Sequence, residues 1–419
     1  MEAKLGLSII PLLFSYLWLA IVIVYTVALA TLLATTKTRI ETGGEHEDFP
    51  SVSLVIPTYN EARIINRKME NILQLDYPKD KLGVLVVDSG STDATREIVR
   101  AFARNNEKRL NVILLGQPTR QGKSAAINEA LRYSNAEVFA LTDADIVVGP
   151  HALKSLVRHL RDDTVGGVSG VEVPVGGQNL LFQVEVGYRS IYTAVRMAEA
   201  AVDTPFMCES EFSAFSRDSL ELLKPGCMCD DLELTVTLRS RGRRAVYALG
   251  VPFFEQEASV FKPKLRHKYR RGMANQHGII RNRRVLFNKT FGRYGSVVFP
   301  FEFFVHILSP FMLLAAFALF TGTIFTAPFD VPMEAVFAVA TGAPALVLLR
   351  RLTRKYVGTE ISNTRRPLSW FLGAISFLGF QMVLAASLAH LALRGPKLQW
   401  SQISETRSPI QGVIQVPSR

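Results

Sequence analysis

Four long apolar stretches set the strongest limit on how this chain can fold. Residues 5–36 contain no charged side chain, and three further apolar stretches follow at about 297–321, 333–350 and 370–393. The hydrocarbon core of a bilayer is about 30 Å thick, and about 20 apolar helical residues are enough to cross it. The sequence therefore predicts an integral membrane protein whose middle part is a large water-facing domain.

The charges beside these stretches predict how the chain is oriented. The first stretch is much longer than the roughly 7–15 apolar residues of a signal peptide, so we expect it to be kept as an anchor. Lys37 and Arg39 follow it, and five more Lys or Arg residues lie in the loop 351–369. Positive charge beside spanning helices marks the cytoplasmic side. We therefore expect a multi-pass cell-membrane protein with its central domain in the cytoplasm.

A basic segment precedes the second apolar stretch. Residues 258–301 hold eleven Lys or Arg residues and no Asp or Glu, within a chain of net charge +11. Such a run suits nucleic acid, anionic lipid or substrate phosphates. We favour a membrane-facing surface that also supplies phosphate ligands, and we expect no nucleic-acid partner, because the run has few interleaved aromatic residues and no recognisable nucleic-acid-binding motif.

The central domain alternates between runs of strand length and amphipathic helical stretches. Strands are predicted at 52–57, 84–88, 112–115 and 138–143, with helices at 61–75, 93–105 and 123–133 between them. This alternation predicts a mostly parallel sheet covered on both faces, with ligands bound beyond the carboxyl ends of its strands. After residue 149 the alternation is less regular, and the stretch 179–201 suits an interfacial helix and an internal helix equally well.

Polar residues gather where the predicted strands end. Residues 57–61 follow the first strand, 88–93 follow the second, and Asp143-Ala144-Asp145 ends the fourth. Two carboxylates two positions apart can both reach one Mg²⁺ or Mn²⁺ ion, directly or through water. Most Asp-x-Asp pairs are only solvated loop residues. The neighbouring strand ends are what make this pair a candidate metal site.

A nucleotide-binding loop of another kind must also be considered. Residues 116–124 follow a strand and open a helix, as a phosphate-binding P-loop does. That motif needs four residues between its glycines, whereas five separate Gly116 from Gly122. No Gly-x-Gly-x-x-Gly follows the first strand either. The sequence therefore disfavours both a P-loop NTPase and a dinucleotide-dependent oxidoreductase.

Several motifs together resemble those of family 2 glycosyltransferases. The segments 57–61, 88–95, 122–128 and 142–146 have the order and spacing of the nucleotide-sugar half of that family. Asp230-Asp231-Leu232, with the helix that follows, resembles the Glu-Asp block, and His267 to Arg271 stands where processive members carry Gln-x-x-Arg-Trp. With the flanking apolar stretches, the chain resembles membrane-bound members related to cellulose and hyaluronan synthases and to lipid-linked sugar transferases.

The resemblance implies a fold and a domain organisation. We expect an α/β domain of the GT-A type, which has a Rossmann-like, mostly parallel sheet that binds a nucleotide-sugar, together with α-helical transmembrane segments. The expected order is a transmembrane helix at 1–40, the cytoplasmic catalytic domain at 50–260, a basic interfacial segment with a phosphate-binding motif at 261–296, about three transmembrane helices at 297–395, and a tail at 396–419. Four spans would leave the carboxyl terminus outside, yet residues 400–407 resemble the cytoplasmic tail of relatives, so one segment could be re-entrant.

The resemblance also implies roles for individual residues. Asp88 would contact the nucleobase or ribose, and Asp231 would be the general base, although an Asp at this position could instead be only a helix N-cap. Asp143 and Asp145 would bind Mg²⁺ or Mn²⁺, with Asp145 as the main ligand. Other members of the implied donor and diphosphate site are Pro57, Tyr59, Glu61, Lys123, Asp230, His267, Arg270 and Arg271. Arginine suits a leaving diphosphate because its planar, always-charged fork binds two oxygens.

Two departures from the family pattern fall on the acceptor side. Arg271 replaces the aromatic residue of the processive motif, and Cys208-Glu209-Ser210 puts a carboxylate where members have glycine. We therefore favour an inverting enzyme that moves one sugar from a nucleotide-sugar, with UDP preferred over GDP, to a membrane lipid or lipid carrier. A processive polysaccharide synthase is the alternative. An inactive membrane scaffold fits less well, because the three carboxylates that activity would need, Asp88, Asp145 and Asp231, are all present.

Overall fold

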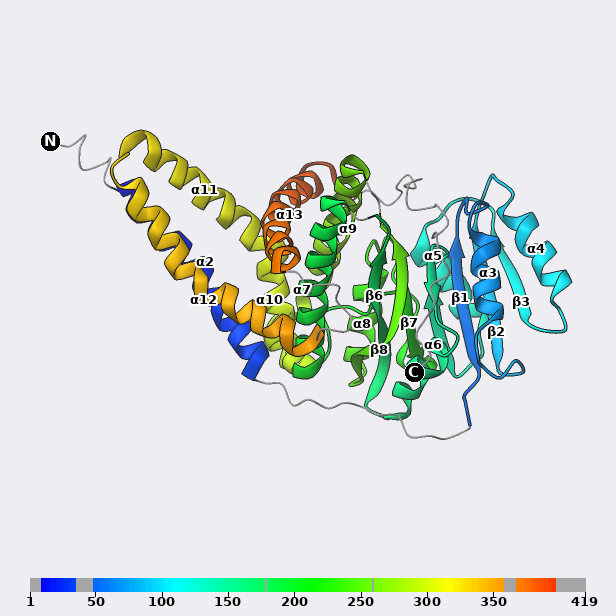
Figure 1. The fold of residues 1–419 in the computed structure, drawn as a ribbon. Helices are drawn as coiled ribbons and strands as arrows, with labels where there is room; N and C mark the ends of the chain where they lie inside the picture. Colours follow the sequence, from blue (N-terminus) through cyan, green and yellow to red (C-terminus); the bar gives the residue numbers. More distant parts are fainter. Residues whose placement is uncertain (1–8, 35–47, 178, 258–259, 358–366, 397–419) are drawn as a thin grey trace.

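The computed structural model describes residues 9–34, 48–177, 179–257, 260–357 and 367–396. An α/β body lies at one end of the molecule, and long helices extend from the other end (Figure 1). Almost all of the predicted tail at 396–419, including the tail-like residues 400–407, lies outside the described residues.

The described residues form one eight-stranded sheet, with the order β3-β2-β1-β4-β7-β6-β8-β5. The strands are β1 (Val52–Thr58), β2 (Leu82–Ser89), β3 (Asn111–Gln117), β4 (Val138–Thr142), β5 (Ile146–Val148), β6 (Val165–Val175), β7 (Phe212–Ser216) and β8 (Arg244–Gln256). β1 to β4 are parallel, β6 is parallel to β8, and β7 and β5 run antiparallel to their neighbours. The predicted α/β fold with a mostly parallel sheet is confirmed.

The apolar runs of the central strands are explained by burial on both faces of the sheet. Side chains alternate along a strand, so Leu54 and Ile56 of β1 join one core cluster, whereas Val55 joins the other. The first cluster includes side chains from α3, α4 and α6, and the second includes side chains from α5 and α8. These helices are α3 (Ile65–Leu73), α4 (Thr95–Asn105), α5 (Lys123–Tyr133), α6 (Ala152–Arg158) and α8 (Asp230–Ser240).

Helices α3 and α4 begin later than the sequence predicted, at Ile65 rather than residue 61 and at Thr95 rather than residue 93. The intervening residues connect two strand ends tightly, and the N–H of Ile65 donates to the carbonyl of Glu61 at 2.9 Å. Asn60 adopts a left-handed conformation with φ of 55°, which short polar side chains tolerate. The N–H of Ala62 donates to Asp93 Oδ2 at 3.1 Å, so this backbone group is bonded outside its own helix.

Two further helices lie between the sheet and the apolar helices. α7 (Leu180–Val202) contacts β6 and β8 on one side and α12 and α13 on the other. Of the two alternatives for the stretch 179–201, the internal helix is therefore the one observed. α9 (Phe261–Arg281), from the basic segment, packs against α8 and α13.

Within the described part of the chain, four helices are long and apolar enough to cross a membrane. They are α2 (Ile9–Ala34), the segment 294–326 that contains α10 (Phe299–Phe303) and α11 (Ser309–Thr326), α12 (Val331–Val357) and α13 (Pro367–Arg394). Two π-helical turns, Tyr294–Val298 and Phe304–Leu308, flank α10. Short 3-10 turns complete the described elements at His159–Arg161, Arg217–Ser219, Arg283–Val285 and Lys289–Phe291.

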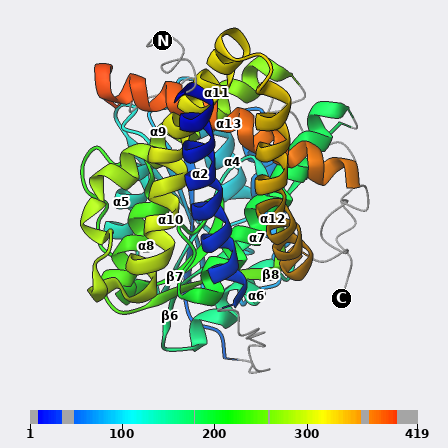
Figure 2. The ribbon, with the colours of Figure 1, turned by 90° about the vertical axis from the view of Figure 1, so that its left-hand side faces the viewer.

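Helix α13 is arranged differently from the other three apolar helices. α2, α11 and α12 run side by side away from the sheet, whereas α13 lies across their direction, against α7 and α9 (Figures 1 and 2). Gly373 lets α13 approach α7 closely, because a Cβ there would lie 2.4 Å from the backbone carbon of Gly187. Gln276 of α9 donates to the carbonyl of Leu384 at 2.8 Å and fixes α13 from the second side.

Candidate active site

The carboxyl ends of β1 and β2 are joined by hydrogen bonds between the two polar segments that follow them. The N–H of Asn60 donates to Ser91 Oγ at 2.8 Å, and the N–H of Thr92 donates to Asn60 Oδ1 at 2.8 Å. The N–H of Glu61 donates to Thr95 Oγ1 at 2.8 Å. The two polar strand ends predicted from the sequence are thus one connected unit at the same edge of the sheet.

The end of β3 completes this edge. Ser89 donates to Gln117 Oε1 at 2.8 Å and accepts from the N–H of Gln121 at 3.0 Å. Gly90 has φ of +73°, and a Cβ on it would lie 2.8 Å from the carbonyl carbon of Thr119, so only glycine fits here.

The loop between β3 and α5 supplies a flat wall to the cavity described below. The guanidinium of Arg120 lies over the ring of Tyr59, 4.1 Å from its centroid. Both side chains line the cavity, as do Pro57 and Glu61. A stacked aromatic and guanidinium pair presents the kind of surface on which a nucleobase can stack.

Asp88 lies below this wall rather than on it. Its side chain is fully buried, and its Oδ2 accepts hydrogen bonds from Arg96 and from the N–H of Ser91. The other oxygen, Oδ1, makes no hydrogen bond to any described residue. Asp88 therefore fixes the end of β2 and keeps one buried oxygen without a hydrogen-bond donor.

Asp143, Ala144 and Asp145 follow β4 and line the cavity. The ammonium group of Lys123, from the first turn of α5, lies 2.8 Å from Asp143 Oδ1 and 2.7 Å from Ser210 Oγ. Although burial lowers the pKa of Lys123, Asp143 and Asp230 raise it above its ordinary value overall. Burial raises the pKa of Asp143 despite the contact with Lys123.

Asp230 and Asp231 open α8, but neither is its N-cap residue, which is Cys229. Asp231 Oδ1 accepts from the N–H of Ser210 at 2.9 Å, and Asp230 Oδ2 accepts from the Ser210 hydroxyl at 2.8 Å. Burial, then the neighbouring Asp230 and Glu211 carboxylates, raise the pKa of Asp231 well above its ordinary value. A carboxylate with a raised pKa binds a proton more strongly, which suits a general base.

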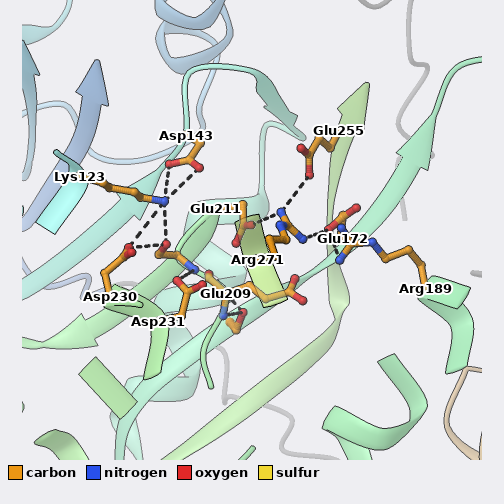
Figure 3. Close-up of polar contacts among 12 residues, drawn as sticks. Lys123, Asp143, Glu172, Arg189, Glu209, Glu211, Asp230, Asp231, Glu255 and Arg271 are labelled. Atoms are coloured by element: carbon orange, nitrogen blue, oxygen red, sulfur yellow. Dashed lines mark hydrogen bonds and ion pairs between the residues drawn. The ribbon is translucent and has the colours of Figure 1, made fainter. Parts of the chain in front are cut away.

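Arg271 is surrounded by carboxylates. Its guanidinium lies 2.6 Å from Glu211 and 3.9 Å from Glu255, whose side chains come from the segment before β7 and from β8 (Figure 3). The predicted diphosphate ligand Arg271 is therefore engaged by protein carboxylates on the side of the cavity away from Lys123. The other two predicted members of that group, His267 and Arg270, line the cavity.

Most of these groups, though not the buried Asp88, line one cavity of about 590 Å³. One end is polar and contains Tyr59, Lys123, Asp143, Asp145 and Asp231. The other end is apolar, and it is lined by residues of α2, α10, α12 and α13, namely Tyr25, Leu29, Phe301, Leu349, Phe377 and Phe380. The cavity thus reaches from the ends of the strands to the helices predicted to lie in the membrane.

Comparison with known proteins identifies the chemistry that this site serves. Residues 53–223 match the family described as "Glycosyl transferase family 2". These residues form a family 2 glycosyltransferase domain. The matched region includes the strand-end segments and the Asp143-Ala144-Asp145 motif. The predicted enzyme class is confirmed.

Individual relatives extend the likeness beyond this domain. The mannosyltransferase PcManGT from Pyrobaculum calidifontis, solved in complex with GDP-Man and Mn²⁺, has 26% sequence identity and a TM-score of 0.65, with 89% of this chain and 99% of that chain covered. The probable glycosyltransferase YdaM of Bacillus subtilis is 27% identical over 67% of this chain and 68% of its own length. The beta-monoglucosyldiacylglycerol synthase of a Synechocystis strain is 32% identical over 29% of this chain and 25% of its own length.

Three contributors to the site were not assigned from the sequence. The Ser210 hydroxyl accepts from Lys123 and donates to Asp230. Glu211 forms an ion pair with Arg271. Arg120 lies over the ring of Tyr59. Ser210 and Glu211 immediately precede β7, a short strand whose sequence pattern is only weakly indicative. A polar tripeptide ahead of the run 212–216 was the available signal.

Proposed function

We propose that this protein is an inverting glycosyltransferase that moves one sugar from a nucleotide-sugar to a hydroxyl group of a membrane lipid or lipid carrier. The observation that carries the proposal is the continuous cavity, which joins the carboxylates of the family 2 domain to aromatic side chains of the apolar helices. A soluble acceptor would not need the apolar end of the cavity. An acceptor with a lipid tail would use both ends at once.

The donor is proposed to be a nucleoside-diphosphate sugar, with GDP-mannose as the first candidate. The family resemblance alone favours UDP. The likeness to PcManGT, which binds GDP-Man and covers 89% of this chain, supports a GDP-sugar instead. The base would stack beside Tyr59 and Arg120, with Glu61 and Pro57 in the same wall, and Asp88 Oδ1 would accept a hydrogen bond from the nucleotide.

Asp143 and Asp145 fit a divalent cation of the Mg²⁺ or Mn²⁺ type. Such ions keep few protein carboxylates and complete their shells with water and phosphate oxygens, so two carboxylates in a cavity wall are a sufficient protein contribution. A bound ion would neutralise charge that develops on the leaving diphosphate. Lys123 is proposed to add positive charge on the same side, with Arg270 and His267 from α9.

Asp231 is proposed to take the proton from the acceptor hydroxyl. The oxygen of that hydroxyl forms a bond to the anomeric carbon while the bond from this carbon to the diphosphate oxygen breaks, and the electron pair leaves with the nucleoside diphosphate. Attack from the face opposite the leaving group inverts the anomeric configuration. Ser210 supports this role, because its N–H orients Asp231 and its hydroxyl binds Asp230.

We further propose that α2, α11 and α12 span the membrane, while α13 lies in its cytoplasmic surface. α13 crosses the direction of the other three and exposes apolar residues at helical spacing, Phe371, Ile375, Leu378 and Met382. Gln381 and Ser387, which lie outside this stripe, are buried. Three spans would put both the catalytic domain and the carboxyl terminus in the cytoplasm, consistent with the basic loop 351–369.

The proposal is tested with the purified full chain, lipid extract and radiolabelled nucleotide-sugars. GDP-mannose and UDP-sugars are compared with Mn²⁺ and with EDTA. A labelled product that partitions into organic solvent and contains one sugar supports the proposal. A labelled product of high mass that stays in water would contradict it and favour the processive synthase.

A further inference from the structure

The middle of the cavity, between its polar end and its apolar end, is built mainly from charged side chains. Four cations line it, namely Arg189, Lys264, Lys268 and Arg271. Each has a carboxylate partner: Arg189 lies 2.7 Å from Glu172, Lys264 and Lys268 lie 3.1 Å and 3.2 Å from Glu185, and Arg271 lies 2.6 Å from Glu211. In the part of the chain that the structure describes, the positive charge of this region is therefore already matched.

Glu209 is the exception among the carboxylates that line this region. It lies in the segment before β7, between the Lys123 group and the Arg271 group (Figure 3). Glu209 is only 4% exposed, and its Oε2 has no hydrogen-bond partner of good geometry among the described residues, although the buried hydroxyl of Tyr247 lies close to this carboxylate. No described cation lies within ion-pair distance of it. Its backbone N–H donates to Ser169 Oγ at 3.0 Å and fixes its position.

A buried carboxylate oxygen without a donor is costly, since it has lost water and gained nothing in return. A ligand that brings hydroxyl donors removes this cost. A phosphate group offers mainly acceptor oxygens and further negative charge, and the four cations named above are already paired with carboxylates. The segment is also close to the proposed base, because the N–H of the next residue, Ser210, is bonded to Asp231.

We propose that Glu209 binds a hydroxyl group of the acceptor, and that the acceptor head group is an uncharged polyol, such as the sugar of a glycolipid or the glycerol of a diacylglycerol, rather than a lipid phosphate. This inference rests on the proposed function, because it names the acceptor of that reaction. Glu209 is then the residue that distinguishes a neutral head group from a phosphorylated one, and the aromatic residues beyond it hold the lipid tail.

The first test offers two acceptors to the full chain with labelled donor and Mn²⁺. One is a neutral monoglycosyl diacylglycerol or diacylglycerol, and the other is a polyprenyl phosphate, each in mixed micelles. Transfer to a neutral lipid, with none to polyprenyl phosphate, is expected. Transfer to polyprenyl phosphate alone would overturn the inference and leave the proposed function standing. Transfer to neither lipid, with high-mass polymer formed or no donor turnover, would overturn both.

The second test uses Glu209→Gln and Glu209→Ala, with Glu107→Gln as the matched control on the exposed surface. Loss of a charged hydrogen bond should raise the KM for the acceptor about ten- to hundredfold, with a much smaller change in the KM for the donor. Glu209→Gln should also raise the Tm, because it removes an unpartnered buried charge. An equal change in both KM values, or a lowered Tm with unchanged acceptor KM, would show that Glu209 is only structural.

Discussion

The ammonium group of Lys123 lies 2.8 Å from the carboxylate of Asp143. The same nitrogen is 3.7 Å from Asp230, next to the proposed base. One side chain from the first turn of α5 therefore connects the metal-binding motif after β4 with the start of α8. The two halves of the reaction centre share a single cation.

Replacing Lys123 with Met should impair both halves. We expect the donor KM to rise and kcat to fall, with kcat/KM lowered about hundredfold, because the side chain both neutralises charge and aligns the two carboxylates. Steady-state kinetics with donor and acceptor varied separately measure this. Lys108→Met, on the exposed surface, is the control. A change in acceptor KM alone would contradict the bridging role.

Removal of the divalent cation should abolish donor binding. We expect EDTA to eliminate binding of GDP-mannose and Mn²⁺ to restore it, because two carboxylates repel a diphosphate in the absence of the ion. Asp145→Ala should remove the dependence on Mn²⁺ together with the binding, and isothermal titration measures both. Metal-dependent binding that survives in Asp145→Ala would place the ion elsewhere.

The raised pKa of Asp231 predicts the acidic limb of the pH profile. A general base works only when deprotonated, so kcat/KM should fall as pH drops through a pKa above the ordinary value of about 3.9 for Asp. Asp231→Asn should lower kcat by about 10²–10⁴-fold. A profile that is flat from neutral pH down to about 4 would argue against this base.

The same shift predicts an effect on stability. A carboxyl group whose pKa is higher in the folded than in the unfolded state stabilises the fold at low pH, and this contribution is lost as pH rises through the folded pKa. At neutral pH the charged form of Asp231 is therefore unfavourable. We expect Asp231→Asn to raise the Tm at pH 7 and to change it little at pH 4, in contrast with its effect on activity.

Arg271 should matter for stability more than for donor binding. Its removal in Arg271→Met would leave Glu211 and Glu255 buried without their cation, which costs about 3 kcal/mol. Thermal unfolding measures this loss, and Arg271→Lys should restore part of it. A variant of unchanged Tm that fails to bind donor would instead support the diphosphate role implied by the sequence motif.

The proposed position of α13 can be measured by spin labels in proteoliposomes. Labels at Phe371, Ile375, Leu378 and Met382 should report one shallow immersion depth, because an in-plane helix keeps all its turns at the same level. Labels at Phe311, Phe317 and Ile324 of α11 should report depths that change along the helix. Depths that change along α13 would show that it spans the bilayer.

The donor half of the site was predictable because its residues follow apolar strands. In a parallel sheet the carboxyl ends meet at one edge, so Thr58, Asp88 and Asp143 could be grouped from the sequence alone. The start of α8 was predictable through the resemblance of Asp230-Asp231-Leu232 to the Glu-Asp block of family 2 glycosyltransferases.

The acceptor half was not predictable in the same way. Its charged groups come from β6, β8, α7 and α9, which are far apart in sequence, and their pairing depends on how α7 and α9 pack. Arg271 illustrates the difference. The motif around it suggested a phosphate ligand, whereas its neighbours in space are Glu211 and Glu255. Charge alone does not reveal which partner a buried guanidinium meets.

The apolar end of the cavity has a kinetic consequence. An acceptor that reaches Asp231 past Tyr25 and Phe377 is drawn from a two-dimensional reservoir, so the relevant concentration is its mole fraction in the bilayer rather than its amount per volume. Adding inert lipid at constant total acceptor should then slow the reaction, while diluting the whole suspension should not. The apparent KM for the acceptor would therefore depend on the amount of inert lipid as well as on the enzyme.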